Sequence, residues 1–212
     1  STATNVGGAL TLISGAAAGI TDSATVTVGG NLIATTDASS GVITLDTLAV
    51  TGNFTLTTHG TGPAIIDNGT ADIDLALASI GGALTLTSGA ATGIFDSGTV
   101  TVGGDLFAIT DANNGDITLD QLAVTGAIDL ATNDSANDNT GHATVVNATA
   151  VKLAASSVDG NLSATATTGN ITQTGALTVT GTTTLLTSAE AATIDLSTTN
   201  NAFTGALTIT TN

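Results

Sequence analysis

The feature that most constrains this chain is a repeat of about 22 residues that keeps its register along the sequence. In two evenly spaced series, a glycine precedes an apolar segment, at Gly8, Gly30, Gly52 and at Gly82, Gly104, Gly126. A constant register lets each unit lie on the previous one, as in a solenoid. A β-sandwich or barrel would show hairpin turns and irregular strand spacing instead.

A longer duplication contains the short repeat. Residues 7–52 and 81–126 are identical at 35 of 46 positions when residue 7 is aligned with residue 81. Weaker copies of the pattern continue through residues 158–212. We therefore expect residues 1–212 to form a single repeat region.

Alternation inside each unit separates an apolar face from a polar face. In the first unit, Leu10 and Leu12 flank Thr11, and in a strand such neighbours point to opposite faces. One repeat step from Leu10 leads to Leu32, and a second leads to Phe54, so the apolar face is preserved. The sequence therefore predicts an all-β fold, a right-handed parallel β-helix with about 22 residues and three short strands per coil. Roughly nine or ten coils would give a rod about 45 Å long.

The charge of the chain excludes several partners. Acidic residues number 17 against one basic residue, Lys152, and the formal net charge is −16. Such a chain repels the phosphates of nucleic acids and the surfaces of anionic membranes. No apolar run reaches the roughly 18 residues that a membrane-spanning helix needs. We expect neither nucleic-acid binding nor membrane insertion.

Several sequence strings resemble a known family. The strings are VGGNL, ITDSATVTVGG, NITQTGALTVTGTTTL and NNAFTGALTIT. They are similar to the repeats of filamentous-haemagglutinin-like exoproteins, which are large bacterial adhesins with β-helical shafts. The resemblance covers essentially the whole chain. It implies an extracellular or bacterial cell-surface location and a role as the structural shaft of an adhesin or extracellular fibre.

Catalysis is not expected. Polysaccharide lyases with a β-helix fold need an Arg or Lys side chain as the catalytic base. In this chain only Lys152 is available. Glycoside hydrolases need two carboxylates at a set separation. The aspartates that recur with the repeat are typical of turns; they are Asp22, Asp46, Asp96 and Asp120.

One segment is a weak calcium candidate, and no other cofactor is expected. Asp111, Asn113 and Asp116 are spaced like the first ligands of a calcium loop. Gly115 occupies the fifth position, where a ligand is expected, and no bidentate glutamate follows. The same residue types are favoured in a tight turn.

Two kinds of outer surface are candidates for contacts. The repeat lengthens between residues 52 and 82 and between 126 and 160, so we expect protruding loops at residues 58–63 and 133–142. Alternation also points Phe95, Phe107 and Ile109 outward, as a candidate lateral contact, unless a corner shifts their register.

Outward threonine pairs suggest an ice-binding face. One repeat step after the pair Thr25 and Thr27, the sequence has Thr47 and Ala49, so this array stops after one coil. β-Propensity alone explains exposed threonines on strands.

The expected partner is the chain itself. The repeat pattern runs to both ends of the sequence, and open solenoid ends are unpaired sheet edges. We expect contacts end to end or laterally, as a homopolymer or as the continuation of a longer chain. The alternative is a surface binding module for a carbohydrate, a host or an ice surface, which would use the loops or the threonine arrays.

Overall fold

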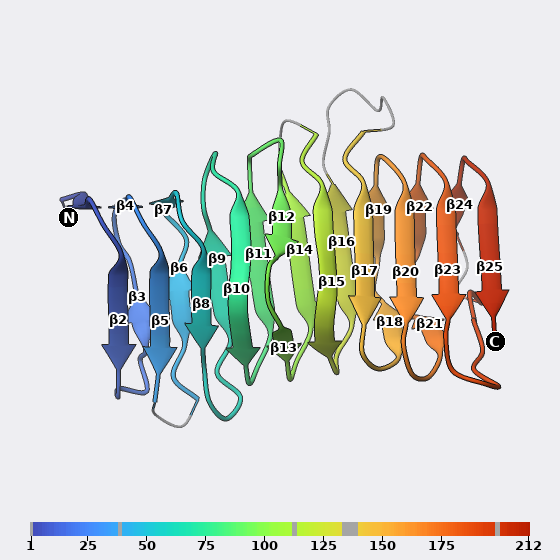
Figure 1. The fold of residues 1–212 in the computed structure, drawn as a ribbon, viewed down its shortest axis with the longest axis horizontal. Helices are drawn as coiled ribbons and strands as arrows, with labels where there is room; N and C mark the ends of the chain where they lie inside the picture. Colours follow the sequence, from blue (N-terminus) through green and yellow to red (C-terminus); the bar gives the residue numbers. More distant parts are fainter. Residues whose placement is uncertain (1, 38–39, 112–113, 133–139, 198–199) are drawn as a thin grey trace.

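The chain forms a parallel β-solenoid of about nine turns (Figure 1). The computed structural model describes residues 2–37, 40–111, 114–132, 140–197 and 200–212. Every strand pair in these residues is parallel, and none of these residues is helical. Coils of about 22 residues with three strands each confirm the predicted fold class. The N- and C-termini lie at opposite ends of the rod.

Three sheets make up the walls of the rod. Sheet A contains β1 (Thr4–Val6), β4 (Val26–Val28) and β7 (Leu48–Val50). Sheet B contains β2 (Leu10–Ser14), β5 (Leu32–Thr36), β8 (Phe54–Thr57), β10 (Ile73–Ile80), β12 (Ile94–Asp96), β13 (Val100–Val102), β15 (Ile117–Val124), β17 (Ala143–Asn147), β20 (Leu162–Ala166), β23 (Thr183–Thr187) and β25 (Leu207–Thr211). Sheet C contains β3 (Ile20–Thr21), β6 (Ile43–Leu45), β9 (Ala64–Asp67), β11 (Leu84–Ser88), β14 (Leu106–Thr110), β16 (Ile128–Thr132), β18 (Val151–Leu153), β19 (Ser156–Val158), β21 (Ile171–Gln173), β22 (Leu177–Val179) and β24 (Ala202–Phe203).

Side chains of successive coils stack in columns. Leu10 lies opposite Leu32, and Leu32 lies opposite Phe54, as the repeat predicts. Leu32 and Phe54 are completely buried. In β14, Leu106 is also completely buried whereas the next residue, Phe107, is partly exposed. The alternation of strand residues therefore correctly separates the interior of the rod from its surface.

The two copies of the duplication occupy different sheets. Strand β2 lies in sheet B, whereas β11, its counterpart in the second copy, lies in sheet C. The offset between the two copies amounts to about three and one third coils. As a result, the strand that follows the glycine of the repeat lies in sheet B in β2, β5 and β8, in sheet C in β11, β14 and β16, and in sheet B again from β20.

The prediction of an inserted loop at residues 58–63 is wrong. Phe54 pairs with Leu75 and Ala64 pairs with Leu84, so each partner still lies one ordinary coil further along the sequence. The residues that lengthen the repeat do not protrude, because they continue the ordinary walls of the solenoid. Thr58 is buried at this corner, and its Oγ1 donates a hydrogen bond of 2.6 Å to the carbonyl of Gly62. Most of the second predicted loop, residues 133–139, lies outside the described residues.

A buried asparagine pairs with a strand end near each place where the strand that follows the repeat's glycine changes sheet. Asn68 Oδ1 accepts the N–H of Val50 at 2.7 Å, and Asn68 Nδ2 donates to the Val50 carbonyl at 3.0 Å. Asn147 binds Val124 in the same way, at 2.8 and 3.0 Å. Both asparagines are completely buried. Each side-chain amide thus replaces the backbone of a missing strand, so that the buried polar groups of the edge remain paired.

Glycine precedes the first strand of the repeat because stacked corners lie too close for a side chain. A Cβ on Gly52 would lie 2.6 Å from the carbonyl oxygen of Gly30. A Cβ on Gly126 would collide in the same way with the backbone of Gly104. The glycine series in the sequence therefore reports the closest approach between coils.

We expect Leu106→Asp to unfold or severely destabilise the rod, whereas Phe107→Asp leaves it folded. An unpaired charge in the interior costs several kcal/mol, and an aspartate on the outer face remains hydrated. Urea unfolding followed by circular dichroism measures both variants. Equal stability of the two variants would contradict the inside and outside assignment.

Candidate interaction surfaces

The recurring aspartates hold the corners of neighbouring coils together. Asp22 Oδ2 accepts hydrogen bonds from the backbone N–H and the hydroxyl of Thr47, both at 3.0 Å. The Asp96 carboxylate accepts the N–H groups of Asp120 and Gln121, each at 3.0 Å. These two carboxylates accept hydrogen bonds from the backbone of the next coil. Asp22 and Asp46 lie between strands, as predicted, whereas Asp96 ends β12 and Asp120 lies within β15.

The calcium candidates lie at a corner that has its own hydrogen bonds. Asp111 is exposed, Asn113 is outside the described residues, and Asp116 Oδ1 accepts the N–H of His142 at 2.7 Å. Thr110 Oγ1 donates to the Gly115 carbonyl at 2.9 Å, which closes the turn. Within the described part of the chain, no three His, Cys, Asp or Glu side chains gather around a common point that could hold a metal ion.

Both histidines make contacts to the backbone of neighbouring coils. His59 Nδ1 lies 2.6 Å from the carbonyl oxygen of Thr36. His142 Nδ1 accepts the N–H of Asn161 at 2.9 Å. Each ring therefore links one coil to another.

The outward aromatic residues do not form a single patch. Phe95 lies on β12 in sheet B, whereas Phe107 and Ile109 lie on β14 in sheet C. On the outer face of sheet C, Phe107 lies opposite Asp129 in the next coil, and Ile109 lies opposite Ala131. The structure thus brings Phe107 and Ile109 together and leaves Phe95 on a different wall.

Burial raises the pKa of two partly buried carboxyl groups. Asp129 is partly buried beside Phe107, and this desolvation raises its pKa above the ordinary value. Desolvation also raises the pKa of Asp96, although the N–H groups of Asp120 and Gln121 oppose the shift. In both residues the charged form therefore costs free energy in the folded state.

A continuous column of hydroxyl side chains runs along the outer face of sheet B. It crosses five consecutive coils through Thr118, Thr144, Ser163, Thr184 and Thr208. We call it the hydroxyl column. The four last strands that carry it, β17, β20, β23 and β25, have no charged residue.

The hydroxyl column cannot be found by advancing along the sequence in equal steps of one repeat, because the number of residues between its members varies from coil to coil. The step from Thr118 to Thr144 is longer than the usual repeat, and the step from Thr144 to Ser163 is shorter. The array that starts at Thr27 does end at Ala49, as expected. The repeat length therefore predicts the end of the array at Ala49 but not the longer hydroxyl column.

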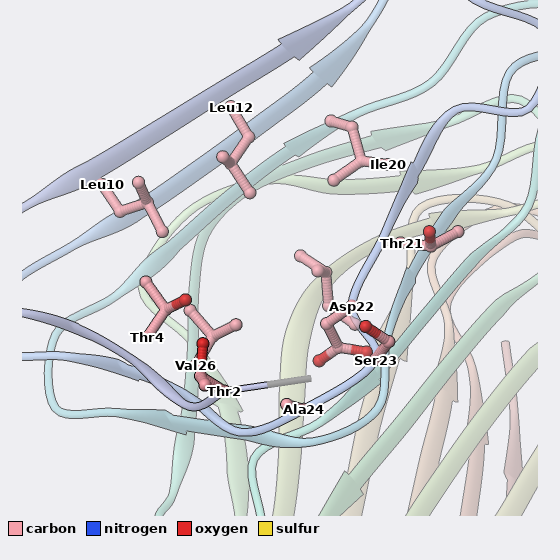
Figure 2. A pocket seen from close by; sticks show the side chains of 11 residues that line it. Thr2, Thr4, Leu10, Leu12, Ile20, Thr21, Asp22, Ser23, Ala24 and Val26 are labelled. Atoms are coloured by element: carbon pink, nitrogen blue, oxygen red, sulfur yellow. The ribbon is translucent and has the colours of Figure 1, made fainter.

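The solenoid interior is open at both ends of the described chain. At the N-terminal end, a cavity of about 500 Å³ is lined by inward side chains of the first coils. Figure 2 shows Leu10, Leu12 and Ile20 pointing into this opening, with Thr4 and Val26 on the opposite side. At the other end, the exposed fractions of Leu207 and Ile209 are 41% and 49%.

One aspartate is buried, which the sequence pattern does not predict. Asp159 is only 6% exposed, and neither of its carboxylate oxygens has a hydrogen-bond partner among the described residues. Its backbone N–H donates to Thr132 Oγ1 at 2.9 Å. Nothing in the spacing of the repeat distinguishes Asp159 from the aspartates at exposed corners.

Part of the chain is similar to a family of repeats. A family model described as repeats of unknown function (DUF5649) matches residues 140–210. No curated protein and no solved structure matches the chain. Among the described residues, no helix has the length and apolar character needed to cross a bilayer.

We predict that Asp129→Asn stabilises the protein near neutral pH. Because the folded-state pKa of Asp129 is raised, the folded protein binds more protons between the unfolded and folded pKa values. The free energy of unfolding therefore falls as the pH rises through this window and Asp129 becomes charged. The asparagine variant cannot become charged, so it avoids this loss of stability. Urea midpoints should differ at neutral pH and converge near pH 3, below the ordinary aspartate pKa of about 3.9. A variant that is less stable at neutral pH would overturn this assignment.

Proposed function

We propose that this chain is a structural shaft segment of a secreted or cell-surface bacterial adhesin or extracellular fibre, like the filamentous-haemagglutinin-like repeats that it resembles. The observation that carries the proposal is the continuity of sheet B. An unbroken parallel path joins β2 at one end of the rod to β25 at the other (Figure 1). Every coil is thus bonded to the next by its backbone.

The direction of these hydrogen bonds suits a shaft. In a solenoid the strands cross the rod axis, so the bonds between coils run along the axis. One such bond contributes only about 1 kcal/mol of net stability. Each coil forms several bonds at once, for example between β11 and β14, where every residue from Leu84 to Ser88 has a partner. Axial load is therefore distributed over many bonds at every level.

The surface charge supports an extracellular location. With a formal charge of −16, neighbouring rods repel one another and stay soluble. The chain has a single Lys or Arg residue, Lys152, and therefore offers one cleavage site to trypsin-like proteases. Both properties favour persistence outside the cell.

Force spectroscopy on the chain tethered at its two ends tests the shaft function. We expect stepwise unravelling in which each coil of about 22 residues releases roughly 75 Å of chain. Leu106→Asp should lower the unravelling force of the central coils, whereas the matched variant Phe107→Asp should not. Smooth extension without steps would contradict a load-bearing role. Antibodies to the chain should label intact, unpermeabilised source cells.

The hydroxyl column favours a second candidate function, attachment to an ice surface. Its side chains repeat at the inter-strand distance of about 4.8 Å. A regular, uncharged array of hydroxyl and methyl groups can order water in a lattice. We expect Thr184→Asp to abolish thermal hysteresis and Ser157→Asp, on the outer face of sheet C, to preserve it. No hysteresis in the unmodified protein would eliminate this candidate.

A further inference from the structure

We propose that a surface groove in the middle of the rod binds an arginine side chain of a basic partner protein. The groove has a volume of about 250 Å³. Its polar lining residues are Thr99, Asp120, Gln121 and Thr167, and its apolar ones include Val146 and Ala148. Sheet B continues from β15 to β2 in one direction and to β25 in the other, so coils stack on both sides of the groove. The site therefore does not depend on how the ends of the rod continue.

A β-bulge exposes two consecutive side chains of β15 at the groove. Leu119 pairs with Val145 of β17, but the next pair joins Leu122 to Asn147, so β15 has one residue more than β17 in this interval. As a result, Asp120 and Gln121 are both exposed, although neighbouring residues of a strand normally point to opposite faces. Bulges of this kind often redirect side chains next to functional sites.

The Asp96 carboxylate holds the bulge in place. It accepts the backbone N–H groups of Asp120 and Gln121, each at 3.0 Å. The side chains of the two bulge residues are left free. In the part of the chain that the structure describes, neither the Asp120 carboxylate nor the Gln121 side-chain amide has a hydrogen-bond partner. The groove thus offers one carboxylate and one amide on a fixed backbone.

These groups match an arginine side chain. The planar guanidinium group donates two parallel hydrogen bonds to a carboxylate, here that of Asp120. The side-chain carbonyl of Gln121 can accept a further guanidinium N–H. Val146 and Ala148 provide apolar surface for the methylene stem, which arginine buries while its charged head stays polar.

Charge and size favour this occupant over a sugar or an anion. The chain carries a formal charge of −16, and Asp96 lies beside Asp120, so the site attracts cations and repels anions. The volume is below the roughly 300–1,000 Å³ of pockets that hold drug-sized ligands. None of the described residues that line the groove is aromatic, so a sugar ring would lack a stacking platform.

The first copy of the duplication lacks two of these features at the same corner. Thr47 stands where the second copy has Gln121, and its hydroxyl donates to Asp22 Oδ2 at 3.0 Å. The residue before the buried asparagine is Asp67 in the first copy and Val146 in the second. The first corner therefore has a shorter, bonded side chain and an additional carboxylate, which makes it a matched control within one molecule.

A titration of the isotope-labelled chain followed by nuclear magnetic resonance tests the site. The probe is N-acetyl-arginine amide. We expect chemical-shift changes at the Gln121 side-chain amide and at the backbone of Thr99 and Ala148. N-acetyl-citrulline amide has nearly the same shape but no charge, and should bind several-fold more weakly. Binding of the arginine probe should also weaken as salt is added.

Two variants with the same net charge separate the groove from the general charge of the rod. Asp120→Asn should weaken binding of the arginine probe several-fold, whereas Asp46→Asn, at the equivalent position of the first copy, should not. Circular dichroism checks that both variants are folded. Equal weakening by the two variants, equal binding of the two probes, or the absence of shifts at the groove would overturn the proposal. So would a stronger response of the same residues to methyl glucoside. Each of these results would leave the shaft function standing, because stepwise unravelling of the rod does not involve the groove.

Discussion

The backbone ladder between successive coils is the constraint on which the rest of the structure depends. Each strand in the middle of the rod bonds to one strand above and one below, so every coil must present the same outline as its neighbours. Inward positions consequently form continuous columns, such as Leu10, Leu32 and Phe54. The glycine corners follow from the same requirement, because a Cβ on Gly52 would meet the backbone of Gly30.

The ladder also explains how the rod changes its cross-section without exposing polar groups. The strand that follows the glycine of the repeat moves between sheets twice, and near each change a strand end, at Val50 and at Val124, lacks a strand neighbour on one side. Asn68 and Asn147 replace that neighbour with a side-chain amide and pair with Val50 and Val124. The buried Thr58 hydroxyl closes a corner in a comparable way. The polar groups in the interior are therefore part of the coil geometry.

Local periodicity was sufficient to predict the strands, the buried faces and the stacking of neighbouring coils. It was not sufficient to place distant copies, because the offset between them contains a fraction of a coil and moves Leu84 to a sheet different from that of Leu10. The same fraction of a coil lengthens the spacing between the glycines, which led to the incorrect prediction of an inserted loop at residues 58–63. The hydroxyl column was missed for a related reason: Thr144 and Ser163 lie side by side, although the step between them is shorter than the usual repeat.

A distance between two coils that are far apart in the rod tests the parallel solenoid most directly. Spin labels at Thr11→Cys and Thr184→Cys would lie on sheet B with eight coil steps between them. At about 4.8 Å for each step, pulsed electron spin resonance should give a narrow distribution near roughly 40 Å in magnetically diluted protein. A distance well below this value, or a broad distribution, would contradict the continuous stacking of coils.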